Sequence, residues 1–256
     1  LEVRTGTGLT SVVADLVGAT DGPTVLLRAD TDALPMTEDT DLEFRSTIDG
    51  RAHACGHDAH TAMLVGAARV LAARRNELQG RVRFMFQPGE EGFAGARLMI
   101  DEGVLDNVDR AFALHVSPNQ RVGTASCRPG PLLAGDTSIT VTVRGHGGHA
   151  STPHLATDPI PATAAIITAL QTTVTREVDV FDPAVLTIAH VVAGTTSNVI
   201  PETALFEGTI RCISERTRAR IREAVARTIR GVAEAHGCTV DIEMVDGYPV
   251  TLNDVG

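Results

Sequence analysis

Four short segments of this sequence gather side chains that can carry out chemistry. They contain a cysteine, several histidines and paired carboxylates, a mixture of donors that divalent metals such as Zn²⁺ or Mn²⁺ accept. The adjacent Glu90 and Glu91 matter most, because one can bind a metal while the other moves protons, and two bare carboxylates would repel without a nearby cation. The four segments are Arg28–Asp32 (RADTD), His53–Asp58 (HACGHD), Gln87–Glu91 (QPGEE) and Leu114–Val116 (LHV).

Each of these residues also has an ordinary structural explanation when it is considered alone. Cys55 fits a small core hydrophobe, and the glutamate pair fits a solvated face. His53, His57 and His60 fit surface positions around a helix N-terminus. His115 differs, because it interrupts an apolar strand and would need a partner if buried. The combination favours a shared site far more than any single residue does.

The first 134 residues alternate between strand-like and helix-like segments, which predicts an α/β domain with a mixed sheet. Thr24–Ala29 is almost entirely apolar, as expected for a strand covered on both faces. It leads to Asp30 and Asp32 at its carboxyl end, the edge where open α/β sheets bind ligands. The predicted strands are Ser11–Val17, Thr24–Ala29, Arg81–Phe86 and Ala111–Val116, and the predicted helix is Ala59–Arg74.

From about residue 137 the pattern becomes βαββαβ, the order of a ferredoxin-like domain. Its second helix follows Ser214, a good N-cap, and ends at Gly237, a good C′ residue. We therefore predict domains at 1–134 and 135–246, with 247–256 a link that returns to the first domain and forms no further element. The predicted elements are Ser138–Arg144 (strand), Pro159–Val174 (helix), Val185–Val192 and Thr203–Ile213 (strands), Glu215–Ala235 (helix) and Thr239–Val245 (strand).

Composition argues against some classes of partner. Acidic residues outnumber basic ones by 32 to 22, and no Lys/Arg cluster is interleaved with aromatics, so nucleic acid is not an expected partner. The apolar stretch around Ile160–Leu170 contains Pro161 and several threonines and is shorter than the ~18–20 residues that cross a bilayer, so no membrane segment is expected. The four cysteines are scattered and no signal peptide is visible, which fits a reducing cytoplasm.

Five strings occur in order along the chain: LLRADTDALPMTED, HACGHDAHTAMLVGAA, FQPGEEGFAGARLMIDEGVL, GHGGHASTPH and TTSNVIPETALFEGTIRC. Together they closely resemble a known family of dinuclear metal-dependent amidohydrolases and metallopeptidases. That family includes aminoacylases, hippurate hydrolases, auxin-conjugate hydrolases and carboxypeptidase G-type enzymes. The resemblance covers essentially the whole chain and implies a catalytic α/β domain interrupted by a lid or dimerisation domain.

The resemblance assigns roles to residues of the first domain. It implies two divalent ions, Zn²⁺ or Mn²⁺ with Co²⁺ or Ni²⁺ as alternatives, and Glu90 as the general base. Asp32 resembles the aspartate that orients a ligand histidine, although Asp30 stands where the family usually has another histidine. The implied metal ligands are Cys55, His57, Glu91 and His115. A further ligand histidine is expected near the C-terminus, and none follows His236, so a chain that ended here would be expected to lack one ligand.

The resemblance also assigns roles in the lid. His149 resembles a histidine that stabilises the oxyanion in the neighbouring subunit, which implies a homodimer formed through the lid. Asn198 and Arg211 resemble residues that bind the substrate's α-carboxylate. The ordinary explanations are that Asn198 caps a turn before Pro201 and that Arg211 is an exposed strand residue. The implied reaction is hydrolysis of the amide bond of an N-acyl-L-amino acid or a similar peptide-like substrate.

Two other classes of function compete with this hypothesis. A thiol hydrolase would use Cys55 as nucleophile and His57 as base, but it leaves the glutamate pair and His115 without a role. A non-catalytic binding module built on the lid is the third class. Only the metal hydrolase needs stoichiometric bound metal for turnover, so metal analysis separates the three.

Overall fold

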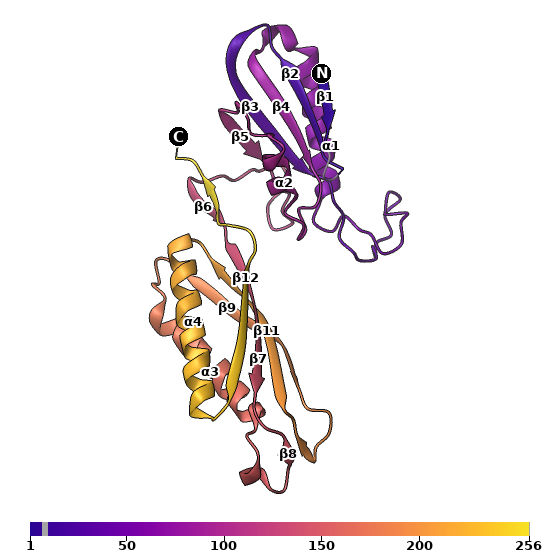
Figure 1. Ribbon diagram of the computed structural model, residues 1–256. Helices are drawn as coiled ribbons and strands as arrows, with labels where there is room; N and C mark the ends of the chain where they lie inside the picture. Colours follow the sequence, from indigo (N-terminus) through magenta and orange to yellow (C-terminus); the bar gives the residue numbers. More distant parts are fainter. Residues whose placement is uncertain (7–9, 256) are drawn as a thin grey trace. The chain divides into compact units, whose positions relative to one another are not determined.

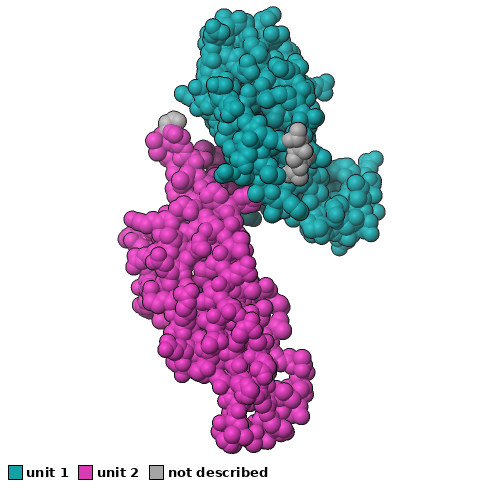
Figure 2. Space-filling model, in the orientation of Figure 1, with its two compact units in different colours: residues 1–124 teal, residues 125–256 magenta. Residues whose placement is uncertain are grey.

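The computed structural model describes residues 1–6 and 10–255 (Figure 1). The chain divides into two compact units, residues 1–124 and 125–256 (Figure 2). Each unit has its own hydrophobic core. Among the helices in the described ranges, none is long and apolar enough to cross a membrane.

Unit 1 is built on five strands: β1 (Glu2–Thr5), β2 (Val12–Val17), β3 (Thr20–Asp30), β4 (Gln79–Gln87) and β5 (Arg110–Ala113). They form one sheet in the order β1-β2-β4-β3-β5. β2 is antiparallel to both β1 and β4, whereas β3 is parallel to both β4 and β5. The predicted α/β class and mixed sheet are confirmed for this unit.

Helices cover both faces of this sheet. They are α1 (His57–Ala73) and α2 (Gly95–Asp101), with a short 3₁₀ turn, η1 (Arg75–Glu77), after α1. Leu64 and Ala68 of α1 belong to the same buried cluster as Phe84 of β4. Met99 of α2 belongs to a second cluster with Met85. Because consecutive strand residues point to opposite faces, Phe84 and Met85 place the two helices on opposite sides of the sheet.

Unit 2 contains a four-stranded antiparallel sheet in the order β12-β7-β11-β9 and two helices, α3 and α4. The main elements are β7 (Gly135–Arg144), α3 (Pro159–Glu177), β9 (Ala184–Ala193), β11 (Thr203–Cys212), α4 (Glu215–Ala235) and β12 (Thr239–Asp246). Shorter ones are β6 (Gly130–Leu133), β8 (Gly148–His149), η2 (Pro153–Leu155), β10 (Val199–Ile200) and β13 (Thr251–Asn253).

The core of unit 2 lies between the sheet and its two helices, which pack on the same face (Figure 1). Phe206 of β11, Leu170 of α3 and Val225 of α4 are all fully buried in this core. Both predicted ends of the second helix are confirmed. The Ser214 hydroxyl accepts a hydrogen bond from the helix backbone at 3.1 Å, and Gly237 has a φ of +71°.

Two sequence predictions were wrong in detail, and one helix was not predicted. The predicted strand Ala111–Val116 ends at Ala113, so His115 lies beyond it. Residues 247–256 do contain a further element, because β13 pairs antiparallel with β6. The helix α2 is missing from the predicted elements, because it is only one to two turns long and follows Ala94, an unusual N-cap with φ +50°.

Candidate metal centre

The carboxyl ends of three neighbouring parallel strands lie at one edge of the unit 1 sheet. Asp30, the last residue of β3, is paired in register with Gln87, the last residue of β4. Arg28 is in register with Ala113, where β5 ends. The loops that leave these ends therefore start beside one another. They carry four of the predicted site residues: Asp32, Glu90, Glu91 and His115.

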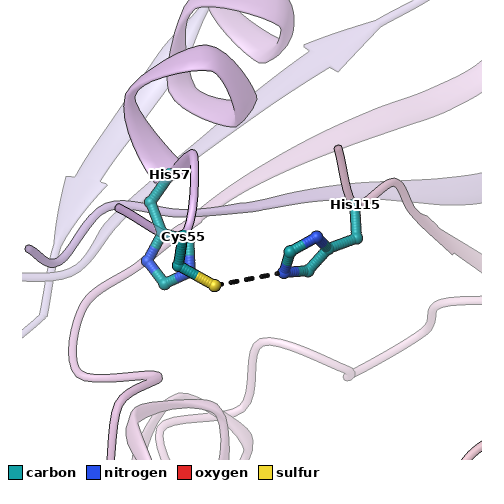
Figure 3. Close-up of side chains that lie close together, drawn as sticks. All are labelled: Cys55, His57 and His115. Atoms are coloured by element: carbon teal, nitrogen blue, oxygen red, sulfur yellow. Dashed lines mark hydrogen bonds between the residues drawn. The ribbon is translucent and has the colours of Figure 1, made fainter. Parts of the chain in front are cut away.

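The amino end of α1 brings Cys55 and His57 to the same place. Between them, Gly56 adopts a left-handed conformation with φ +82° at the start of the helix. Cys55 Sγ lies 3.5 Å from His115 Nε2 (Figure 3). The ligand atoms of Cys55, His57 and His115 all lie within 4.8 Å of one another. A tetrahedral zinc ion with ligands at about 2.0–2.3 Å holds them about 3.3–3.8 Å apart, so only a small contraction would be needed.

The two predicted ligand histidines have their rings oriented for metal binding. His57 Nδ1 donates to the main-chain oxygen of Asp32 at 2.9 Å, and His115 Nδ1 donates to that of Val116 at 2.7 Å. Since a carbonyl oxygen only accepts, each Nδ1 carries a proton, and in the neutral ring each Nε2 then keeps the lone pair that a metal would use. His57 Nε2 is buried and has no hydrogen-bond partner within the described part of the chain. A buried lone pair without a partner is unfavourable, and a metal ion would satisfy it.

A second group of donors overlaps the first at the same imidazole. Ligand atoms of His57, Glu90 and Glu91 also lie within 4.8 Å of one another. The main-chain N–H of Glu91 donates to Asp32 Oδ2 at 2.9 Å, which fixes the start of the glutamate loop. Together the two groups contain five potential donor residues and share His57. The residues present therefore fit a divalent metal, with enough donors for two neighbouring ions.

The pKa values of Glu90 and Asp32 are shifted in opposite directions. Burial raises the pKa of Glu90, and the neighbouring Glu91 raises it further. For Asp32, burial raises the pKa, but hydrogen bonds from the Glu91 and Glu90 backbone outweigh it and leave the pKa lowered. Asp32 therefore stays ionised, while Glu90 is shifted toward the range in which a carboxyl group exchanges protons near neutral pH.

The environment of Cys55 argues against a cysteine nucleophile. Burial, and then the charges of Glu91 and Glu90, raise the pKa of the Cys55 thiol to about 11. A nucleophilic cysteine needs the opposite, a lowered pKa that makes thiolate available at neutral pH. A bound cation would instead favour the thiolate form of Cys55, because metal binding displaces the thiol proton.

Several of the ordinary explanations for these residues are wrong. Cys55 is partly exposed rather than a core residue. His57 and His60 are not surface residues, since they are only 1% and 3% exposed. The exposed His53 does fit the surface explanation. No role was predicted for His60, although it lies one helical turn after His57 and so faces the same way.

The structure brings two of the three predicted lid residues together. β8 and β10 pair so that Val199 lies opposite His149. Next to this pair, the N–H of Ala150 donates to the main-chain oxygen of Asn198 at 3.1 Å. His149 Nδ1 accepts from the backbone N–H of Ser151 at 3.1 Å. His149 and Asn198 are therefore neighbours at one end of unit 2.

Arg211 lies toward the other end of the same unit. It is opposite Asp136 in the β7–β11 ladder. The far end of that ladder pairs Thr203 with Arg144, and Thr203 is eight residues from Arg211 along β11. At ~3.3 Å per residue this separation is about 26 Å. The Arg211 guanidinium is half exposed and lies 3.2 Å from the Asp136 carboxylate.

Comparison with known proteins gives consistent matches over both units. The model of peptidase family M20/M25/M40 matches residues 26–256. N-acetylcysteine deacetylase of Bacillus subtilis (strain 168) is 43% identical over 245 residues, which are 96% of this chain and 64% of that protein. Thermostable carboxypeptidase 1 of Saccharolobus solfataricus is 40% identical over an alignment of 258 positions, which covers 99% of this chain and 66% of that protein. The chain thus spans slightly less than two thirds of the length of these relatives.

A solved structure is similar as well. It is a Bacillus subtilis protein described as a dinuclear metal binding peptidase from the M20 family, with a TM-score of 0.84 and 39% identity. The match covers 99% of this chain and 66% of that one. The family model, the identity to relatives and the fold agree, and the predicted resemblance is confirmed: the chain belongs to peptidase family M20/M25/M40.

Proposed function

We propose that this protein uses two divalent metal ions to hydrolyse the amide bond of an N-acyl-L-amino acid or a similar small peptide-like substrate. The observation that carries the proposal is the pair of donor groups that share His57, whose buried Nε2 has no hydrogen-bond partner among the described residues and lies 4.0 Å from Glu90 Oε2. The names of the relatives, a deacetylase of N-acetylcysteine and a carboxypeptidase, support this class of substrate.

In this proposal Cys55, His57, Glu91 and His115 hold the ions. Ions bound there would polarise the scissile carbonyl and lower the pKa of the attacking water. Thiolate, imidazole and carboxylate together favour Zn²⁺ or Mn²⁺, with Co²⁺ or Ni²⁺ as substitutes. Glu90 accepts the proton of the attacking water and later delivers it to the leaving nitrogen, which its raised pKa favours.

Asp32 is proposed to orient two ligands at once. Its main-chain oxygen receives the Nδ1 proton of His57, and its carboxylate receives the backbone N–H of Glu91. Residues that support metal ligands in this way typically change metal affinity or activity by ~10–100-fold when they are replaced.

Within unit 2, residues 135–246 are proposed to form a ferredoxin-like lid and dimerisation domain, between a catalytic domain at 1–134 and its continuation from 247. The βαββαβ order with strand order β12-β7-β11-β9 supports this assignment. All four cysteines are free, which supports a reducing compartment such as the cytoplasm.

The lid residues are proposed to serve two subunits of a homodimer. His149 and Asn198 lie at one end of unit 2 and Arg211 lies about 26 Å or more away along the ladder, so a small substrate cannot touch both ends of one lid. We assign oxyanion stabilisation to His149, acting in the neighbouring subunit. Recognition of the substrate carboxylate is assigned to Asn198 and Arg211, contributed by different subunits.

The test compares two adjacent substitutions in the full-length protein, Glu90→Gln and Glu91→Gln. Glu90→Gln keeps the side-chain shape but cannot accept a proton, so turnover should fall by ~10²–10⁴-fold with metal content unchanged. Glu91→Gln should lose bound metal as well as activity. Metal content is measured by mass spectrometry, and turnover is measured on N-acetyl, N-benzoyl and indole-acyl amino acids.

Glu77→Gln is the matched control, because Glu77 is an exposed glutamate of the same unit whose carboxylate pairs with Arg74 just after α1. It should behave like the unaltered protein in both measurements. Equal metal loss in the Glu90 and Glu91 variants would contradict the division of labour. Turnover that persists without bound metal would contradict the proposed function.

A further inference from the structure

One buried histidine beside the metal centre has no role in the proposed reaction. His60 is 3% exposed, and its ring lies 4.7 Å from that of His115 and 5.6 Å from that of His57, measured between ring centroids. Both of its nitrogens have partners. Nδ1 lies 2.6 Å from Asp30 Oδ1, and Nε2 accepts the main-chain N–H of Val116 at 2.9 Å.

These two contacts define the state of the ring. A backbone N–H only donates, so Nε2 must carry the lone pair and Nδ1 the proton, which it donates to Asp30. A histidine with both nitrogens engaged has no lone pair for a metal. His60 therefore does not act as a ligand in this arrangement, even though Asp30, His57 and His60 place potential ligand atoms within 4.8 Å of one another.

The partner of His60 leads directly to a proposed ligand. Val116 follows His115 in the chain, and its two main-chain groups have separate tasks. Its N–H is held by His60 Nε2, and its carbonyl oxygen receives the Nδ1 proton of His115. The position of this one residue therefore decides where His115 Nε2 points, which is toward Cys55 Sγ at 3.5 Å.

The other end of the chain of contacts is anchored in the sheet. Asp30 is fully buried, and its second oxygen lies 2.7 Å from Arg28 Nη1. Arg28 Nε in turn donates to Gln87 Oε1 at 2.8 Å, and Gln87 is the last residue of β4. His60 thus connects two rigid strand ends to a loop that has no strand pairing of its own after Ala113.

We propose that His60 is a positioning residue that transmits the fixed position of Asp30 through Val116 to the ligand His115. The inference rests on the proposed metal centre. It adds a residue that contacts no metal but sets the geometry of one that does.

Two substitutions test the two ring nitrogens of His60 separately. The amide of Gln reaches the position of Nε2 and can accept the Val116 N–H, whereas the amide of Asn reaches only the position of Nδ1 and leaves that N–H without a partner. His60→Asn should therefore weaken Co²⁺ binding by ~10–100-fold and change the visible spectrum of bound Co²⁺. His60→Gln should recover most of the affinity and the spectrum.

Thr61→Val is the matched control. The Thr61 hydroxyl donates to the main-chain oxygen of Asp30 at 3.0 Å, so this variant removes a hydrogen bond from the same region without touching Val116. It should lower thermal stability while Co²⁺ affinity stays unchanged. All variants are made in the full-length protein and titrated with Co²⁺ after metal removal.

A measurement on the unaltered protein keeps the inference testable if a variant fails to fold. Ring ¹⁵N shifts of His60 should report the neutral Nδ1–H form, and the Nε2–H form would overturn the inference. Equal Co²⁺ affinities of the Asn and Gln variants would also overturn it, and loss of one full metal equivalent in both would identify His60 as a ligand instead. If the unaltered protein binds no Co²⁺, the proposed function fails and this inference fails with it.

Discussion

Gly56→Ala tests how tightly the proposed metal centre depends on the backbone between two of its proposed ligands, Cys55 and His57. Gly56 has φ +82°, a left-handed conformation that glycine adopts freely and alanine does not. A Cβ at this position would lie 2.3 Å from Val116 Cγ2, far inside van der Waals contact. The substitution therefore strains the start of α1 and pushes on the residue that orients His115.

The expected loss of stability has two parts, the left-handed backbone of the new alanine and its contact with Val116. A left-handed alanine costs about 1–2 kcal/mol, of which about 0.4–1 kcal/mol is returned because alanine restricts the unfolded chain. Displacing Val116, which is 38% exposed and can partly move away, adds at most about 1–3 kcal/mol, the usual cost of an overpacked core contact. The net expectation is about 1–5 kcal/mol, together with weaker metal binding because His115 loses its alignment with Cys55.

Gly50→Ala provides a matched control in the same unit. Gly50 also has a left-handed backbone, with φ +66°, but beyond its chain neighbours no atom lies within 4 Å of the methyl group that alanine would add, so only the backbone term applies. With no Trp and a single Tyr, Tyr248 in unit 2, fluorescence would not report on unit 1. Hydrogen exchange of the α1 amides and Co²⁺ titration are therefore the appropriate assays. Similar exchange and equal Co²⁺ affinity in the two variants would refute the role given to the Val116 contact.

Two further predictions concern unit 2. Hydrogen bonds from Thr217, and then from Arg216, lower the pKa of Asp182 to about 2. The ionised carboxylate therefore adds about 2 kcal/mol to the free energy of unfolding. This contribution is complete above the unfolded pKa of Asp182 and is lost as the pH falls through about 2. Asp182→Asn should therefore destabilise the protein at pH 7. In urea unfolding, the difference in free energy of unfolding between the variant and the unaltered protein should shrink by about half near pH 3, and a difference independent of pH would contradict this linkage. Mixing inactive His149→Ala and Glu90→Gln full-length proteins should restore partial activity through hybrid dimers, and no recovery after verified subunit exchange would count against the shared site.

The regular elements could be predicted because their signals are local. The near-continuous apolar run ending at Ala29 predicted a strand covered on both faces, and β3 has a helix on each side. Ser214 and Gly237 marked the ends of α4 through capping chemistry that depends only on neighbouring residues. In contrast, β13 forms only because β6 lies beside it, and a partner more than a hundred residues away leaves no local pattern.

The candidate site was predictable in its members but not in its internal connections. Residue types and order indicated a metal site among Cys55, His57 and the glutamate pair, and the family resemblance implied the role of each. Nothing in the sequence indicated that Asp32 would hold His57 through its main-chain oxygen rather than mainly through its carboxylate. Such a contact depends on how two loops meet at the sheet edge, and any residue type can supply the carbonyl group.

The histidines at this edge illustrate why residue type alone does not assign a role. His57, His60 and His115 all carry their proton on Nδ1, and all three rings lie within 6.3 Å of one another by centroid distance. What separates them is the partner of Nε2. That atom has no hydrogen-bond partner among the described residues in His57, faces a thiol in His115 and is occupied by a backbone N–H in His60. The first two can therefore accept a metal, whereas the third is already committed to the backbone that aims its neighbour.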